Sequence, residues 1–237
     1  MSWQAHIITL MPEAFPGLLG QSLSGRALEN KIWSLHLHAL RDHGIGKHKN
    51  VDDTPSGGGA GMVIRPDVAA NAVDAVTAQN PDIPMLVASP RGMPLTQQRI
   101  KKLAAGPGVA IFCPRFEGVD ERFYQARQIE EISLGDYILS GGDLAAQIII
   151  DATIRLLPGV MGGAESSVEE SFENHLLEYP HYTRPAIWED KSIPDVLTSG
   201  DHQKVAQWRQ SQAEELTKNR RPDLFERYLL AQKAEKS

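Results

Sequence analysis

The pattern of apolar and polar positions along the first 160 residues alternates between strand-like and helix-like segments. Four short stretches are typical of strands, three as continuous apolar runs and one by strict alternation; they are residues 6–10, 33–38, 84–88 and 109–113. Four further stretches have apolar residues at helical spacing, namely residues 24–29, 67–77, 96–104 and 143–157. Strands that alternate with helices predict an α/β domain with a mainly parallel sheet.

The pattern changes after residue 160. Residues 161–173 are small, polar and acidic and lack apolar periodicity, so we interpret residues 161–175 as an inter-domain linker. Asp201 is a suitable cap for a helix that runs to about residue 218, and Pro222 suits the first turn of another. The sequence therefore predicts an α/β domain over 1–160 and a small helical domain over 176–237.

Composition adds limits on location and partners. The chain has 237 residues, one cysteine and a formal charge of −6. The sequence has no membrane-length apolar run and no secretory leader, and its cysteine lies inside an apolar run. We therefore expect a cytoplasmic protein that is independent of membranes. The acidity disfavours nucleic acid, but residues 209–233 carry six basic side chains against four acidic ones, which leaves room for a local basic surface.

Two features have weak functional readings. The glycine-rich loop at 57–61 lacks the residues that complete a phosphate-binding or dinucleotide motif, so a flexible loop is the simpler interpretation. Four histidines, at positions 36, 38, 43 and 48, have no partner at characteristic metal-ligand spacing. We predict no metal site there and place His36 and His38 on the solvent face of a strand.

Other conspicuous motifs follow buried strands or precede a buried helix. Ser89-Pro90-Arg91-Gly92 and Pro114-Arg115-Phe116-Glu117-Gly118 come at strand ends, where parallel sheets bind ligands. A glycine-rich stretch at 134–142 leads into the last helix of the domain. On that helix Asp151 and Arg155 share a face, which is consistent with an ion pair or with an arginine that binds an anion.

Six blocks, in this order, closely resemble the bacterial tRNA (guanine-N1)-methyltransferases. They are Val51-Asp52-Asp53 with Gly57-Gly58-Gly59-Ala60-Gly61-Met62, Ser89-Pro90-Arg91-Gly92, Arg115-Phe116-Glu117-Gly118-Val119-Asp120-Glu121-Arg122, Gly135-Asp136-Tyr137-Ile138-Leu139-Ser140-Gly141-Gly142, Arg155-Leu156-Leu157-Pro158-Gly159-Val160 and His181-Tyr182-Thr183-Arg184-Pro185. The similarity spans residues 6 to about 222.

The resemblance implies a fold and a cofactor site. The family has an α/β domain of the SPOUT type, with a trefoil knot in the backbone, and a small all-α C-terminal domain that grips tRNA. Three loops of the knot hold S-adenosylmethionine, the methyl donor. The residues implied are Val87, Ala88, Ser89, Pro90, Pro114, Glu117, Gly118, Leu134, Gly135, Asp136, Tyr137, Ile138, Leu139, Gly141 and Gly142.

The resemblance also implies a target and a catalytic pair. The family acts as a homodimer with active sites at the subunit interface and methylates N1 of the guanosine 3′ of the anticodon, tRNA position 37. A carboxylate takes the N1 proton, and an arginine stabilises the charge on O6. By resemblance these are Glu170 and Arg155, while Asp52, Glu117 and Arg184 bind the substrate. The family depends on magnesium, but the sequence reveals no metal site.

Two departures from the family pattern leave alternatives open. The general base is usually an aspartate before a Ser-Phe pair; here Glu170 precedes Ser171-Phe172, and Glu169 is a rival. Pro114 replaces a glycine and has no N–H to offer the cofactor, and Phe116 replaces a tyrosine. Two other functions remain: a 2′-O-ribose methyltransferase on a related knotted fold, and an RNA-binding module that has lost activity.

Overall fold

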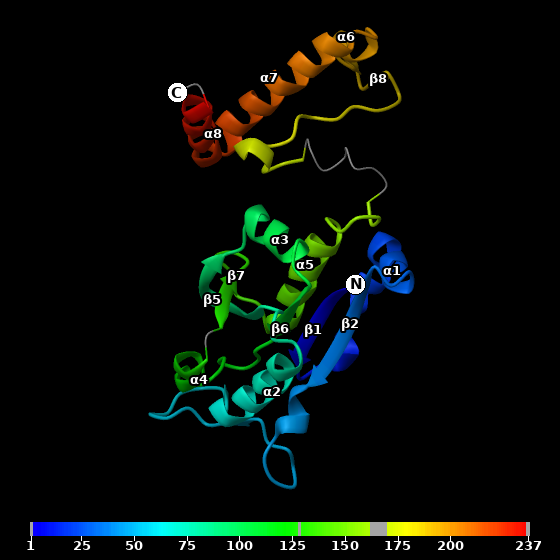
Figure 1. Cartoon of the computed structure of the whole chain (residues 1–237). Helices are drawn as coiled ribbons and strands as arrows, with labels where there is room; N and C mark the ends of the chain where they lie inside the picture. The colour runs from blue at the N-terminus through cyan, green and yellow to red at the C-terminus, as the bar shows by residue number, and fades with distance from the viewer. Residues whose placement is uncertain (1, 128, 162–169, 236–237) are drawn as a thin grey trace. The chain divides into compact units, whose positions relative to one another are not determined.

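The computed structural model describes residues 2–127, 129–161 and 170–235. The chain divides into two compact units, residues 1–162 and 163–237, which are described separately (Figure 1).

A five-stranded sheet forms the centre of the first unit, with strand order β2-β1-β6-β5-β7. Every neighbouring pair is parallel, so the predicted sheet is confirmed. The strands are β1 (Trp3–Thr9), β2 (Trp33–Ala39), β5 (Met85–Pro94), β6 (Gly108–Phe112) and β7 (Glu130–Ser133). Strand β7 was not predicted, because its Glu130-Glu131-Ile132-Ser133 sequence is too short and polar to stand out as an apolar run.

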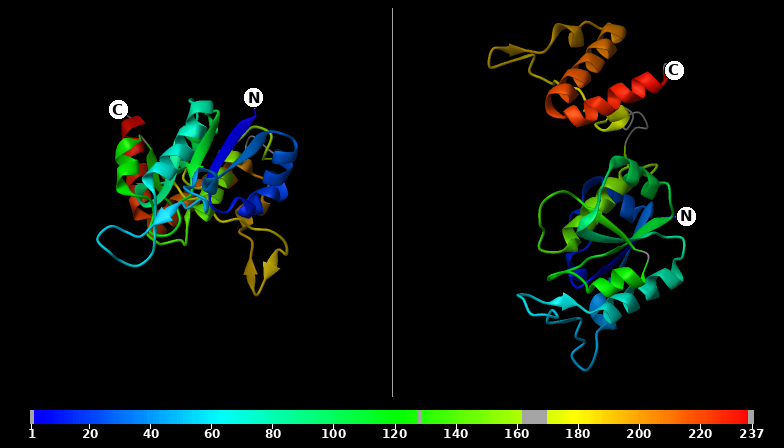
Figure 2. Two further views of the ribbon diagram at one scale, coloured as in Figure 1. Left: turned by 90° about the horizontal axis from the view of Figure 1, so that it is seen from below. Right: turned by 90° about the vertical axis from the view of Figure 1, so that its left-hand side faces the viewer.

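Helices cover both faces of this sheet (Figure 2). The side chains of Ala5 and Ile7 pack into one buried cluster with residues of α1, α3 and α5, whereas Ile8 packs into a second cluster with residues of α2 and α4. The period-two alternation of a strand separates the two clusters. The helices are α1 (Ser22–Glu29), α2 (Pro66–Gln79), α3 (Gln97–Ala104), α4 (Glu121–Ala126) and α5 (Gly142–Ile154).

Among the predicted boundaries that were wrong, two bear on the site. Helix α5 ends at Ile154 rather than at residue 157, so Arg155 is its C-cap residue and Asp151 is exposed. Strand β5 continues to Pro94, with a register shift between Ala88 and Met93. The Ser89–Gly92 motif therefore lies within an irregular part of the strand and not after its end.

Short elements connect the larger ones of the first unit. The two-residue strands β3 (Asp52–Asp53) and β4 (Val63–Ile64) pair antiparallel and flank the glycine-rich loop. Short 3-10 helices occur at η1 (Pro12–Ala14), η2 (Gly17–Gly20) and η3 (Leu40–His43).

The second unit is mainly helical, as predicted, with an unpredicted hairpin. Its elements are η4 (Glu173–His175), β8 (Ile187–Trp188), β9 (Lys191–Ser192), α6 (Asp195–Thr198), α7 (His202–Arg220) and α8 (Pro222–Glu235). The Asp201 side chain accepts a hydrogen bond from the Lys204 N–H and caps α7 as predicted. Glu189 and Asp190 have positive φ and form the hairpin turn, a conformation that the sequence did not signal.

The segment at the start of the second unit is attached to α7. The backbone N–H of Leu177 donates to Thr217 Oγ1 at 2.8 Å, and Leu176 is buried. The Glu178 N–H donates to the Ser171 hydroxyl at 3.0 Å. Residues 171–175, which we placed in a linker, are therefore fixed at their end to a helix.

In the part of the chain that the structure describes, no helix has the length and apolar character needed to span a membrane.

Candidate functional site

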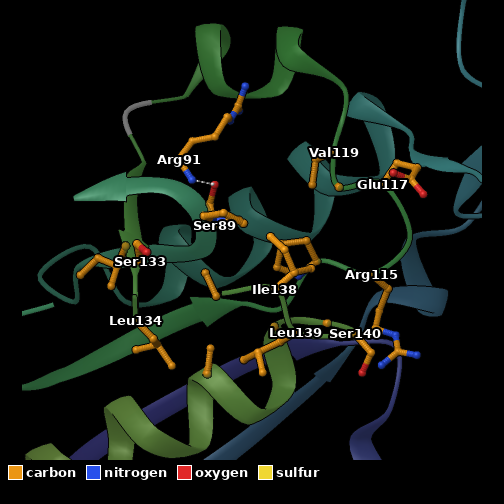
Figure 3. Close-up of a pocket in the computed structure, with 18 of the residues that line it drawn as sticks. Ser89, Arg91, Arg115, Glu117, Val119, Ser133, Leu134, Ile138, Leu139 and Ser140 are labelled. Carbon is orange, nitrogen blue, oxygen red and sulfur yellow. Dashed lines mark hydrogen bonds between the residues drawn. The ribbon is translucent and has the colours of Figure 1, made fainter. Parts of the chain in front are cut away.

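The first unit contains a pocket of about 430 Å³ that could hold a ligand (Figure 3). Its walls come from residues 88–91 of β5, from residues 114–119 after β6 and from residues 132–135 and 137–142 at and after β7, together with Tyr124 of α4 and Ala145 of α5. These strands are parallel neighbours, so their carboxyl ends meet at one edge of the sheet. The three conspicuous motifs of the sequence therefore enclose one pocket.

Most of the residues predicted to bind the cofactor line this pocket. Those present are Ala88, Ser89, Pro90, Pro114, Glu117, Gly118, Leu134, Gly135, Tyr137, Ile138, Leu139, Gly141 and Gly142. Val87 and Asp136 do not line it. Val87 is fully buried within β5, among the residues that pack against α2.

The loop after β6 meets the start of α5 by direct backbone contact. The N–H of Gly142 donates to the Pro114 carbonyl at 2.8 Å. A Cβ atom on Gly142 would lie 2.8 Å from Cys113 Cα, which is closer than real side chains approach. Glycine is required here because the two backbones touch. Because residue 114 is a proline, the pocket has no backbone N–H at this position. The Pro114 carbonyl already accepts the hydrogen bond from Gly142.

One wall of the pocket carries an arginine held by several partners. Arg91 Nη1 donates to Glu121 at 2.9 Å, and its guanidinium also lies 3.5 Å from Glu131. The same guanidinium is 5.1 Å from the centre of the Tyr124 ring. Burial raises the pKa of Tyr124 to about 12, so its phenol stays protonated at neutral pH. The Arg91 guanidinium therefore has carboxylate partners within the protein.

The opposite side holds a second arginine, Arg115, beside Ser140 in Figure 3. A Cβ on Gly141 would lie 2.5 Å from Arg115 Cδ, so the arginine stem lies against the Gly141 backbone. Arg115 Nη1 is 3.9 Å from Oδ2 of Asp143, a carboxylate that is only 7% exposed. The hydroxyl of Thr9 donates to the other oxygen of Asp143 at 2.5 Å.

Glu117 is exposed at the rim of the pocket, next to the glycine-rich loop. Its N–H donates to the Met62 carbonyl at 2.9 Å. Gly61 has a φ of +84°, and a Cβ there would lie 2.6 Å from Glu117 Oε1. The end of the loop therefore needs glycine both for its conformation and for the space that Glu117 occupies.

The other predicted site residues lie outside the pocket lining. Asp52 is half-buried in β3 and pairs with Ile64. Arg155 is half-buried at the end of α5. In the second unit, Glu170 is partly buried next to Ser171, and Arg184 is exposed in a hollow of about 450 Å³ that also includes Trp188 and Lys191. Glu169, the alternative to Glu170, lies outside the described residues.

The histidines form a contact that the sequence did not suggest. His6 is buried in β1 and stacks on His36, with ring centres 4.6 Å apart, and its Nδ1 lies 3.2 Å from Nε2 of His38. His36 is exposed as predicted, but His38 is only partly so. Among the described residues, no group of three or more His, Cys, Asp or Glu side chains could hold a metal ion. The expected magnesium ion therefore has no assigned site.

Several pocket residues were missing from the predicted set. Tyr124, Ile132, Ser133 and Ala145 reach the pocket from α4, β7 and α5. None of them belongs to a motif, and only the sheet order brings them to the loops. Arg91 and Arg115 belong to motifs that the sequence analysis recognised. Their places on opposite sides of the pocket, and their different carboxylate partners, could not be inferred from sequence spacing.

A parallel α/β sheet with a pocket near the carboxyl ends of its strands is an arrangement common to many enzymes that bind small ligands. The comparison with protein families is more specific: the family tRNA (Guanine-1)-methyltransferase TrmD matches residues 3–227. The chain belongs to this family, whose α/β domain has the knotted SPOUT fold, so the family and the fold class inferred from the motifs are confirmed.

Related proteins agree over almost the full length. A tRNA (guanine-N(1)-)-methyltransferase of Novosphingobium aromaticivorans is 58% identical over 229 residues, which is 97% of this chain and 93% of the relative. The protein with the same name in Mesorhizobium japonicum is 58% identical over 231 residues, which is 98% of this chain and 100% of the relative. That of Rhizorhabdus wittichii is 59% identical over 228 residues, with 96% and 93% covered.

Proposed function

We propose that this protein transfers a methyl group from S-adenosylmethionine to N1 of the guanosine immediately 3′ of the anticodon in tRNA, at position 37, in the cytoplasm. The observation that carries the proposal is the single pocket made by the three motif-bearing loops. Membership of the family gives the reaction class, and the pocket gives a place for its donor.

The pocket has the character that this donor needs. Its volume of about 430 Å³ falls in the range of roughly 300–1,000 Å³ that is usual for small-molecule sites. Ile132, Leu134 and Leu139 supply apolar surface, and glycines at 135, 141 and 142 keep side chains from filling the space. When bound, S-adenosylmethionine supplies a methyl group on a positively charged sulfur, and no redox partner is needed.

The chain must remove the proton from guanine N1 and stabilise the charge that forms on O6. We assign the first task to Glu170 and the second to Arg155. Two observations support these roles. Arg155 is half-buried at the end of a rigid helix, and Glu170 directly precedes Ser171, whose hydroxyl is bonded to the Glu178 N–H. The described backbone beside each group is held by hydrogen bonds, which supports the proposed roles.

Three other residues are proposed to bind the tRNA. Glu117 at the rim of the pocket would accept hydrogen bonds from the guanine edge, and Asp52 lies in the short hairpin that leads to the same loop. Arg184 lies in the hollow of the second unit with Lys191, where basic side chains can contact phosphates.

We further propose that two copies of the chain form the working enzyme. Leu144 and Ile148, one turn apart on α5, are 56% and 49% exposed, and Leu18 is 82% exposed. Apolar side chains grouped near an active site favour a protein interface. The active site would then be completed at the interface between subunits.

The decisive experiment is methyl transfer to unmodified tRNA followed by nucleoside analysis. The expected product is 1-methylguanosine; a 2′-O-methylated nucleoside would establish the ribose methyltransferase instead. Cofactor binding without any transfer would indicate an inactive RNA-binding module.

Variants of the linker acids test the base. Glu170→Gln keeps the shape but cannot accept a proton, so its single-turnover rate should fall by about 10²–10⁴ while tRNA and cofactor bind nearly normally. Glu170→Asp should retain part of the rate, and Glu169→Gln is the matched control that should stay fast. A slow Glu169→Gln beside a fast Glu170→Gln would exchange the two assignments. Mixed dimers of Glu170→Gln and Arg155→Ala subunits should recover activity if the two groups come from different chains.

A further inference from the structure

The pocket has two arginines, Arg91 and Arg115, and they differ in their interactions with neighbouring carboxylates. Arg91 is held by Glu121 and Glu131 and lies over the Tyr124 ring, so its charge is already balanced. Arg115 is one-third exposed, and in the part of the chain described here its ion pair is with Asp143 alone, at 3.9 Å. That distance is too long for a hydrogen bond. Arg115 therefore keeps hydrogen-bond donors for a ligand in the pocket.

Asp143 explains how Arg115 is kept at this place. The carboxylate is 93% buried, and Thr9 donates to its Oδ1 at 2.5 Å, whereas Oδ2 has no hydrogen-bond partner among the described residues. It lies in the first turn of α5, where the helix N-terminus favours a negative charge. A buried carboxylate oxygen of this kind attracts the nearest cation, which is the Arg115 guanidinium.

We propose that Arg115 binds the carboxylate of the methionine part of S-adenosylmethionine, and that Asp143 is the positioning residue that holds Arg115 against the Gly141 backbone for this purpose. The inference rests on the function proposed above. A guanidinium suits this ligand because its planar donors match the two oxygens of a carboxylate. Arg91, by contrast, contributes to the shape of the wall.

The proposal predicts discrimination between two ligands that share the nucleoside. S-Adenosylhomocysteine carries the amino-acid carboxylate, and 5′-methylthioadenosine lacks it. In Arg115→Gln, calorimetry should show S-adenosylhomocysteine binding weakened roughly tenfold to a hundredfold, the range for a lost charge-assisted hydrogen bond, with 5′-methylthioadenosine affinity within about twofold of wild type. Asp143→Asn should shift the same ratio in the same direction by a smaller factor.

Arg91→Gln is the matched control, because it makes the same substitution at the other arginine of the pocket. It should change the affinities for both ligands by the same factor. Equal losses for both ligands in Arg115→Gln, or no loss for either, would overturn the assignment of Arg115. An unchanged ratio in a folded Asp143→Asn protein would overturn the positioning role. If Asp143→Asn does not fold, Arg115→Gln still decides the first part, because its side chain is partly exposed.

The wild-type protein separates this inference from the proposed function. Failure of the wild type to bind either ligand would contradict the cofactor assignment itself. Binding of both ligands with no effect of Arg115→Gln on their ratio would contradict only the carboxylate contact.

Discussion

The two units of the chain are stabilised in different ways. The first unit has two buried clusters, one on each face of a parallel sheet, and its ligand pocket is formed where the strands end. In the second unit the buried apolar side chains of the described residues are Leu176, Ala213 and Leu224, and each of them keeps 7–8% exposure. Its helices depend more on caps and single hydrogen bonds. The first unit can therefore hold a ligand pocket rigid, whereas the second is suited to adjust to a large, irregular substrate.

The sharpest way to break this comparison is to make a cavity in each core. Ile111→Ala in β6 should lower the free energy of unfolding by about 2–5 kcal/mol, because Ile111 is fully buried in a large cluster. Leu224→Ala, the matched change in the second unit, should cost less, because its small core can collapse around the gap. Urea denaturation gives the totals, and hydrogen exchange of peptides from residues 1–162 and 163–237 shows where protection is lost. Equal costs would mean that the two units are equally well packed.

The next effect is a pH dependence confined to the first unit. Burial, and the charges of His36 and His38, lower the pKa of His6 to about 4. The unfolded chain takes up this proton near pH 6.5, whereas the folded chain resists it until about pH 4. Stability should therefore be full above pH 6.5 and fall as the pH drops towards 4, by about 1–3 kcal/mol. His6→Gln should flatten this part of the stability curve, and an unchanged slope would assign the effect to other groups, such as His38.

A smaller change tests the hydrogen bond that attaches the start of the second unit to α7. Thr217→Val keeps the shape but removes the hydroxyl that accepts from Leu177 N–H and donates to the Ala213 carbonyl. The expected cost is about 1–2 kcal/mol. Exchange at residues 171–178 should accelerate with no change in the first unit. Normal protection there would show that Leu176 packing alone holds the segment.

The smallest effect is expected at a helix cap. Asp201→Ala removes the acceptor for the Lys204 N–H at the start of α7, which should cost about 1 kcal/mol. Asp201→Asn is the control, because asparagine also caps helices and should restore most of the loss. Thermal melts followed by circular dichroism would measure both.

Large apolar segments made the main architecture predictable. The strands with continuous apolar sequence and the long helices of the first unit could be located from apolar patterns, and α7 and α8 from Asp201 and Pro222 at their starts. Strand β7 could not be located, because two of its four residues are glutamates. The hairpin of β8 and β9 depends on positive φ at Glu189 and Asp190. Aspartate tolerates this conformation, but glutamate rarely adopts it, so the pair does not stand out as a hairpin turn. Such elements form because of contacts with residues that are distant in the sequence. A short stretch of sequence does not show those contacts.

The site divides along the same line. Residues within motifs, such as Ser89, Gly118 and Gly142, could be assigned to one ligand because family resemblance grouped them, and the structure brings them to one pocket. Tyr124 could not, since only the tertiary structure brings its ring to Arg91 and to the pocket. The pairing of Thr9 with Asp143, 134 positions apart, likewise follows from tertiary structure alone.

The lone cysteine offers an independent view of motion in the first unit. Cys113 is completely buried beside the contact between Gly142 and the β6 loop, and burial together with Asp143 raises the pKa of its thiol. It can react with a thiol reagent only when this part of the sheet opens. Pulses of a maleimide would therefore count opening events at the base of the pocket in an unmodified protein. A ligand that contacts all of these loops should lengthen the time between opening events and so slow the labelling of Cys113.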